Sequence, residues 1–143
     1  MKLKLSVDAG AYIVSGLFLL LLGPHWMGAA LASALVHELG HIALLWVFGV
    51  RVYGIHIGAF GARIQTEALY GKTGILCTLA GPAAGGMLLL FFRWLPRTAV
   101  CGVVQSLYNL IPVYPLDGGR ALRYWREEKA VAKSFTSGYN RLD

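Results

Sequence analysis

Charged residues are scarce in this 143-residue chain, and acidic residues are scarcer than basic ones. Only 14% of its residues are charged, against about 25% in typical soluble domains. A soluble fold of this size exposes much of its surface, and seven acids with thirteen bases could not cover it. Disorder is excluded too, because 57% of the residues are hydrophobic. What remains is a small integral membrane protein of one domain, residues 1–143.

Cysteine is equally scarce. Cys77 and Cys101 lie inside apolar runs and form no CxxC pair. Two such thiols are too few for a disulfide scaffold and lack the spacing of a thiolate metal site. We expect both to be buried as small hydrophobic residues.

Long apolar runs are what the chain has in plenty. Four stretches approach the length needed to cross a bilayer, although the first is short and must tilt or thin the membrane. We read the first as an uncleaved span. The sequence predicts an all-α membrane protein of about four transmembrane helices, followed by a polar basic tail. The predicted spans are residues 10–22, 26–48, 74–92 and 98–116, and the tail covers residues 120–143.

Residues 52–67, between the second and third spans, have a different pattern. Apolar residues alternate with glycines and polar residues, and residues 58–61 carry a turn signal. We predict a small membrane-associated β-hairpin. Because polar backbone is tolerated at membrane depth only against protein or water, such a hairpin indicates a wet cleft.

The basic residues are distributed unevenly between the two predicted sides of the membrane. Only Arg93 and Arg97 fall on one side, and the other eleven fall on the side that the positive-inside rule makes cytoplasmic. This distribution explains the net charge of +6 by orientation in a lipid bilayer and requires no nucleic acid. The eleven are Lys2, Lys4, Arg51, Arg63, Lys72, Arg120, Arg123, Arg126, Lys129, Lys133 and Arg141.

The second span contains an HExxH motif, His37-Glu38-Leu39-Gly40-His41. Residues i and i+4 share a helix face, so both imidazoles can bind one metal ion, with Glu38 beside them as a general base. The alternative is a pair of structural histidines at a helix interface. It is disfavoured, because ionisable residues inside a membrane span are costly and usually functional.

A catalytic zinc site normally has three protein ligands, so one more is needed. Asp117 fits best, because it ends the fourth span near the histidines. Pro112 and Pro115 break that helix and can bend Asp117 inward, and the glycines that follow permit close backbone approach. Without the histidines, Asp117 would be read as an ordinary turn residue. The other candidates are His25, His56, Asp8, Asp143, Glu67, Glu127, Glu128, Cys77 and Cys101. An alternate-ligand or gating role for His56 stands beside the simpler reading of a surface histidine.

Three motifs together resemble the site-2 protease family of intramembrane zinc metalloproteases, and its sporulation branch most closely. They are the HELGH run, the tripeptide Ala80-Gly81-Pro82, and the run NLIPVYPLDGGR over residues 109–120. The likeness covers about residues 26–120 and includes the glycine-containing hairpin.

The resemblance implies Zn²⁺ as cofactor and cleavage of a peptide bond in or near the span of a membrane-tethered protein. A sigma-factor precursor in sporulation, regulatory membrane proteins as partners and a bacterial cell membrane are implied as well. The alternative is a proteolytically inactive membrane protein that binds metal or a partner, and a retained Glu38 argues against it. The implied site residues are the zinc ligands His37, His41 and Asp117, the catalytic base Glu38, and the substrate-positioning residues Asn109, Pro112 and Pro115.

Overall fold

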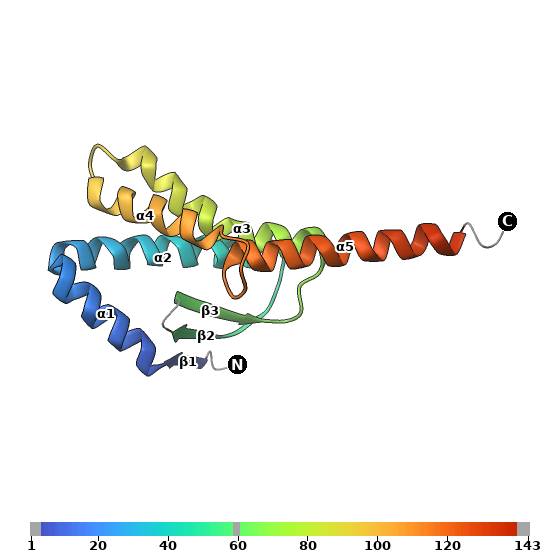
Figure 1. Ribbon diagram of the computed structural model, residues 1–143, viewed down its shortest axis with the longest axis horizontal. Helices are drawn as coiled ribbons and strands as arrows, with labels where there is room; N and C mark the ends of the chain where they lie inside the picture. Colours follow the sequence, from blue (N-terminus) through green and yellow to red (C-terminus); the bar gives the residue numbers. More distant parts are fainter. Residues whose placement is uncertain (1–3, 59–60, 140–143) are drawn as a thin grey trace.

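The computed structural model describes residues 4–58 and 61–139, with side chains as far as residue 133. The described chain is an elongated helical bundle with a small sheet alongside it, and the last helix projects beyond the bundle (Figure 1). Inferences that involve Lys2, Ala59, Phe60, Arg141 and Asp143 lie outside the described residues. The elements are β1 (Lys4–Val7), α1 (Ala9–Leu22), α2 (Pro24–Val47), β2 (Val52–Gly58), β3 (Gly61–Thr66), α3 (Gly71–Met87), the 3-10 helix η1 (Leu88–Phe91), α4 (Pro96–Asn109) and α5 (Asp117–Tyr139).

The predominantly helical prediction is confirmed, and the first helices lie close to the predicted spans. α1 and α2 meet at Gly23, whose φ of 77° is a conformation that glycine adopts readily. Pro24 follows at the first helical position of α2, where its missing N–H costs nothing. α1 then slants away from α2, while α2, α3 and α4 lie side by side (Figure 1).

Helices α2 and α3 pack closely through small residues. A Cβ added at Gly40 would lie 2.6 Å from the carbonyl oxygen of Ala80 and 2.6 Å from the Cβ of Ala84. Only glycine at this position lets the two backbones approach so closely, as is common between membrane helices. This approach brings α3 against the histidine face of α2.

The predicted hairpin is present as β2 and β3, which pair antiparallel with His56 opposite Arg63. The sheet also has a third strand that the sequence did not predict, because β1 pairs parallel to β2 with Ser6 opposite His56. β1 has only four residues. Its partner lies about fifty residues away in sequence, so no local pattern identifies the pairing.

The core lies where the sheet meets the bundle. Its buried side chains are Leu45 of α2, Leu69 before α3, Cys77 of α3 and Tyr124 of α5. Val52 and Ile64 pack against this cluster from the sheet. The Tyr124 ring occupies the space over Gly74, where a Cβ would lie 2.8 Å from it.

The fourth predicted span, residues 98–116, is not one continuous helix. α4 ends at Asn109, and residues 110–116 form turns before α5 begins at Asp117. Pro112 explains the early end, because proline lacks an N–H and disfavours helical geometry in the residue before it. The predicted tail is therefore the rest of α5, whose early residues Ala121 and Tyr124 are buried rather than solvated.

Two of the described helices are long and apolar enough to cross a membrane, judged by length and composition: Pro24–Val47 and the continuous segment Gly71–Phe91. Both carry exposed apolar side chains, and Leu35 and Trp46 are 62% and 82% exposed. α1 and α4 have 14 residues each, or about 21 Å of helix, against a hydrocarbon core of about 30 Å. Four transmembrane helices therefore stay a prediction.

The contact at Gly40 predicts a specific sensitivity to substitution. Gly40→Ala should destabilise the protein by about 1–3 kcal/mol, because the added methyl group must displace the α3 backbone. Thermal unfolding in detergent measures this as a lower midpoint. Gly28→Ala is the control on the same helix, since a Cβ there meets nothing within 4 Å. Equal midpoints for the two variants would contradict the close packing of α2 on α3.

Candidate metal centre

The two motif histidines face the interior of the bundle from α2. Their exposed fractions are 2% for His37 and 7% for His41. A Cβ at Gly81 of α3 would overlap the His41 ring, so this ring fills space that only glycine leaves open. The four-residue spacing thus presents both rings to one point, as the sequence predicts.

Asp117 reaches the same point as the first residue of α5, and only 7% of it is exposed. Gly118 and Gly119 follow it, and a Cβ on either would collide with backbone atoms of Leu110 and Val113 respectively. The turn and the helix start are therefore packed backbone against backbone, and this packing holds the carboxylate inward.

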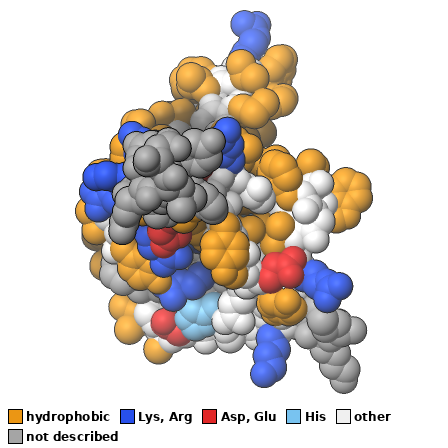
Figure 2. All heavy atoms as spheres, turned by 90° about the vertical axis from the view of Figure 1, so that its right-hand side faces the viewer, with side chains coloured by type: hydrophobic (Ala, Val, Ile, Leu, Met, Phe, Trp, Pro, Cys, Tyr) orange, Lys and Arg blue, Asp and Glu red, His pale blue; other side chains and the backbone are white. Residues whose placement is uncertain are grey.

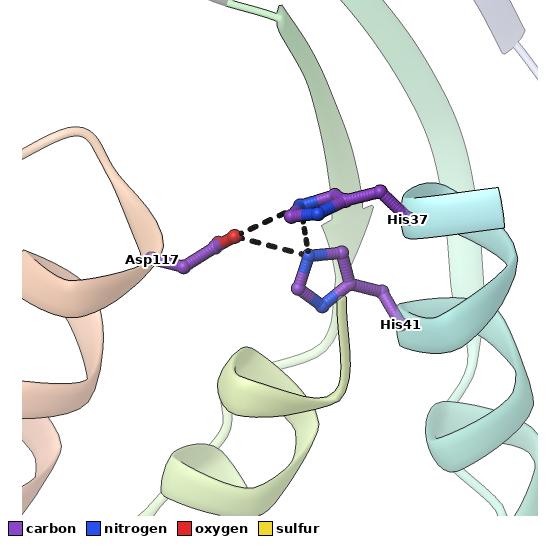
Figure 3. A group of neighbouring side chains, drawn as sticks. All are labelled: His37, His41 and Asp117. Atoms are coloured by element: carbon purple, nitrogen blue, oxygen red, sulfur yellow. Dashed lines mark hydrogen bonds and ion pairs between the residues drawn. The ribbon is translucent and has the colours of Figure 1, made fainter. Parts of the chain in front are cut away.

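The three side chains converge in a nearly equilateral triangle (Figure 3). Oδ2 of Asp117 lies 3.1 Å from Nε2 of His37 and 3.2 Å from Nε2 of His41, and the two nitrogens are 3.2 Å apart. Zinc bonds of about 2.0–2.1 Å in tetrahedral geometry place ligand atoms about 3.3 Å from each other. The triangle fits such an ion, and it is the one group of this kind among the described residues.

Neighbouring groups orient two of the three ligands. Nδ1 of His41 donates to the carbonyl of Cys77 at 2.8 Å, so Nε2 of the neutral ring keeps its lone pair. Nη1 of Arg120 lies 3.6 Å from Oδ1 of Asp117, which leaves Oδ2 for the histidines. Nδ1 of His37 is buried and bonds no atom of the described residues.

A cavity of about 150 Å³ opens beside the three ligand atoms. Glu38, Asn109 and Pro115 line it together with the ligands, whereas Pro112 is not among its lining residues. All of the site residues predicted from the sequence except Pro112 therefore line one cavity. Strand β3 borders the same cavity.

Two polar residues of this cavity were missed from the sequence. Gln105 lies four residues before Asn109, on the same face of α4, and Thr78 lies next to Cys77 on α3. The helical spacing from Asn109 could have identified Gln105. No sequence signal identifies Thr78, because its position depends on how α3 packs on α2.

The other candidate ligands lie elsewhere. His56 bonds Ser6 through Nδ1 at 2.8 Å, and its Nε2 lies 3.9 Å from Asp8, on the sheet rather than at the triangle. Cys77 contacts His41 through its carbonyl, not its thiol. Glu67 accepts from the backbone N–H of Arg51.

Comparison with known proteins finds relatives that include two putative zinc metalloproteases and a sporulation protein. The chain is 32% identical over 108 residues to a putative zinc metalloprotease of Synechocystis sp. and 32% identical over 127 residues to the putative zinc metalloprotease Rip3 of Mycobacterium tuberculosis. It is 29% identical over 137 residues to stage IV sporulation protein FB of Bacillus subtilis. These alignments cover 64%, 74% and 84% of the chain but only 28%, 32% and 46% of the relatives.

The fold is also similar to that of a solved structure. The site-2 protease from Methanocaldococcus jannaschii superposes with a TM-score of 0.68 at 21% identity, over 86% of this chain and 68% of that one. No protein-family model matches the sequence.

The triangle predicts how metal binding depends on Asp117. Asp117→Ala should weaken Zn²⁺ binding by more than about hundredfold, because even outer partners of metal ligands are worth about 10–100-fold. Competition titration with a chromophoric chelator measures this. Glu127→Ala is the control, since Glu127 lies on α5 and pairs with Arg123, 3.4 Å away. Unchanged affinity in Asp117→Ala would remove Asp117 from the ligand set.

Proposed function

Because this chain belongs to the site-2 protease family of zinc metalloproteases, we propose that it is an intramembrane zinc metalloprotease. It cleaves a peptide bond in or near the transmembrane segment of a membrane-tethered protein. One observation carries the proposal: three buried ligand atoms lie 3.1–3.2 Å apart beside a cavity bordered by Glu38.

The chemistry divides between the metal and the chain. His37, His41 and Asp117 would hold a zinc ion, which would act as a Lewis acid toward the scissile carbonyl and lower the pKa of bound water. Glu38 accepts a proton from the attacking water and passes it to the leaving nitrogen, so that the C–N bond breaks and an amine departs. Asn109, the last residue of α4, borders the cavity and donates a hydrogen bond to the substrate carbonyl.

A helical substrate must unwind locally, because the hydrogen bonds within a helix shield its peptide bonds from attack. Strand β3 offers an edge that could bind the extended segment. The carbonyl of Ile57 accepts from the N–H of Asp8 at 2.9 Å, so it points toward β1. Ala62 lies opposite Ile57, and its N–H and C=O therefore point away from β2. No strand of the described residues pairs with that edge, which lies at the cavity and suits β-augmentation.

The proposed setting is multi-pass in a bacterial cell membrane, with the metal centre toward the cytoplasm. The four crossings are α1, α2, the segment α3–η1, and α4 with the first turns of α5, a broken helix of the kind that lines sites in membrane proteins. Figure 2 looks onto the end from which α5 projects, where Lys and Arg side chains gather at several places. Arg93 follows η1 and Arg97 lies in the first turn of α4, at the opposite end of the bundle. The asymmetry supports this orientation.

The finer proposal is that the substrate is a sigma-factor precursor in sporulation and that other membrane proteins regulate the cleavage. Its support is the 29% identity to stage IV sporulation protein FB. A proteolytically inactive metal-binding protein has no need of a carboxylate at Glu38.

The role of Glu38 predicts separate effects on metal and on rate. In proteoliposomes with Zn²⁺ and a single-span substrate, Glu38→Gln should keep bound zinc and lose cleavage by about 10²–10⁴-fold, as expected for a missing general base. A chelator should abolish cleavage by the wild type. Glu127→Gln is the matched control and should cleave normally. Equal cleavage by Glu38→Gln and wild type would overturn the catalytic role of Glu38.

The free edge of β3 predicts an effect of proline at Ala62. Ala62→Pro removes an edge N–H without breaking the β2–β3 ladder, so it should cut cleavage by about tenfold, the value of roughly one hydrogen bond. Ala62→Val keeps the N–H and serves as the control for side-chain size. Zinc content should be equal in both variants. If Ala62→Pro cleaves as well as Ala62→Val, strand addition at this edge is wrong.

A further inference from the structure

Gln105 is a polar residue of the cavity that neither the motifs nor the metal centre explain. It lies on α4, which runs alongside α2 (Figure 1), and its Oε1 accepts from Oγ of Ser33 at 2.9 Å. We propose that Gln105 is a substrate-binding residue: its amide NH₂ donates to a backbone carbonyl of the extended substrate. This inference rests on the proposed function and extends it to the recognition of the substrate backbone.

Ser33 determines which end of the Gln105 amide is available. Ser33 is 1% exposed, and its single hydroxyl proton is shared between Oε1 of Gln105 and the carbonyl of Ala30, 3.0 Å away. With Oε1 turned to Ser33, the NH₂ group is the end left for the cavity. Among the described residues, Ser33 is the one hydrogen-bond partner of the Gln105 side chain.

The spacing between Gln105 and Asn109 matches an extended peptide. Four residues of α-helix span about 6 Å, and two residues of a strand span about 6.6 Å. Carbonyls two residues apart on a strand point to the same side. When Asn109 contacts one carbonyl, Gln105 is placed to contact the carbonyl two residues away.

The neighbours of Gln105 support binding rather than packing. Thr78 lines the same cavity, is 2% exposed, and has a hydroxyl that bonds no atom of the described residues. Ser33 stands one turn before His37 on α2, just as Gln105 stands one turn before Asn109 on α4. The cavity thus extends its polar lining one helical turn away from the metal ligands. A purely structural Ser33–Gln105 pair would join α2 to α4 without requiring that the amide border a cavity.

The test separates binding from chemistry. Cleavage of a single-span substrate is measured for wild type, Gln105→Glu, Gln105→Leu and Val104→Gln, together with zinc content. Gln105→Glu keeps the size and the oxygen facing Ser33 but removes the donor, and Val104 is a control because it is 61% exposed on α4. Binding of the same substrate is measured by fluorescence anisotropy for Glu38→Gln alone and combined with Gln105→Glu, so that affinity is obtained without turnover.

We expect Gln105→Glu and Gln105→Leu to raise the apparent KM about tenfold, with kcat changed less than about twofold and zinc content unchanged. In the Glu38→Gln background, Gln105→Glu should weaken binding by the same factor. A KM of Gln105→Glu equal to that of Val104→Gln would overturn the proposal, as would an effect confined to kcat or to zinc content. A different outcome is that the wild type cleaves nothing while adding Gln105→Glu to the Glu38→Gln variant still weakens substrate binding. In that case the proposed proteolysis fails and the peptide-binding role of Gln105 stands.

Discussion

The His41 ring occupies space that a side chain at Gly81 would fill, and the arrangement of the metal centre depends on this contact. Because α3 lies so close to α2, the carbonyl of Cys77 can accept a hydrogen bond from Nδ1 of His41 and fix the orientation of the ring. Gly40 makes the approach possible one residue away on α2. The glycines of the two helices therefore serve the site through packing, since they allow the backbone of one helix to become a hydrogen-bonding partner for the other.

The broken end of α4 is the second constraint. A continuous helix from Pro96 would carry the chain past the histidines, whereas the turns at residues 110–116 bring Asp117 to them at the start of a new helix. The break also leaves Asn109 at a helix end that borders the cavity. One interruption thus supplies both a candidate ligand and a candidate substrate contact.

Around this centre the chain builds a polar space within an apolar exterior. The cavity is bordered by the edge strand β3 on one side and by polar residues of α3 and α4 on the other, while residues such as Leu35 and Trp46 face outward. Burial of polar side chains without partners is costly. The Thr78 hydroxyl and the Gln105 amide nitrogen bond no atom of the described residues, which is consistent with a site that receives a peptide backbone. This account joins the proposed chemistry to the proposed mode of binding.

Local patterns in the sequence determined much of this protein. Apolar run lengths predict the main helices, alternation predicts the β2–β3 hairpin, and the four-residue spacing places His37 and His41 on one face. The proline-rich run after Asn109 singles out Asp117 and predicts a break in the helix, and α4 ends at Asn109. The tertiary structure alone decided the parallel pairing of β1, the fit of His41 against Gly81, and the Ser33–Gln105 bond. These contacts join residues up to 72 positions apart, and whether they form depends on how closely two backbones approach, which no local periodicity encodes.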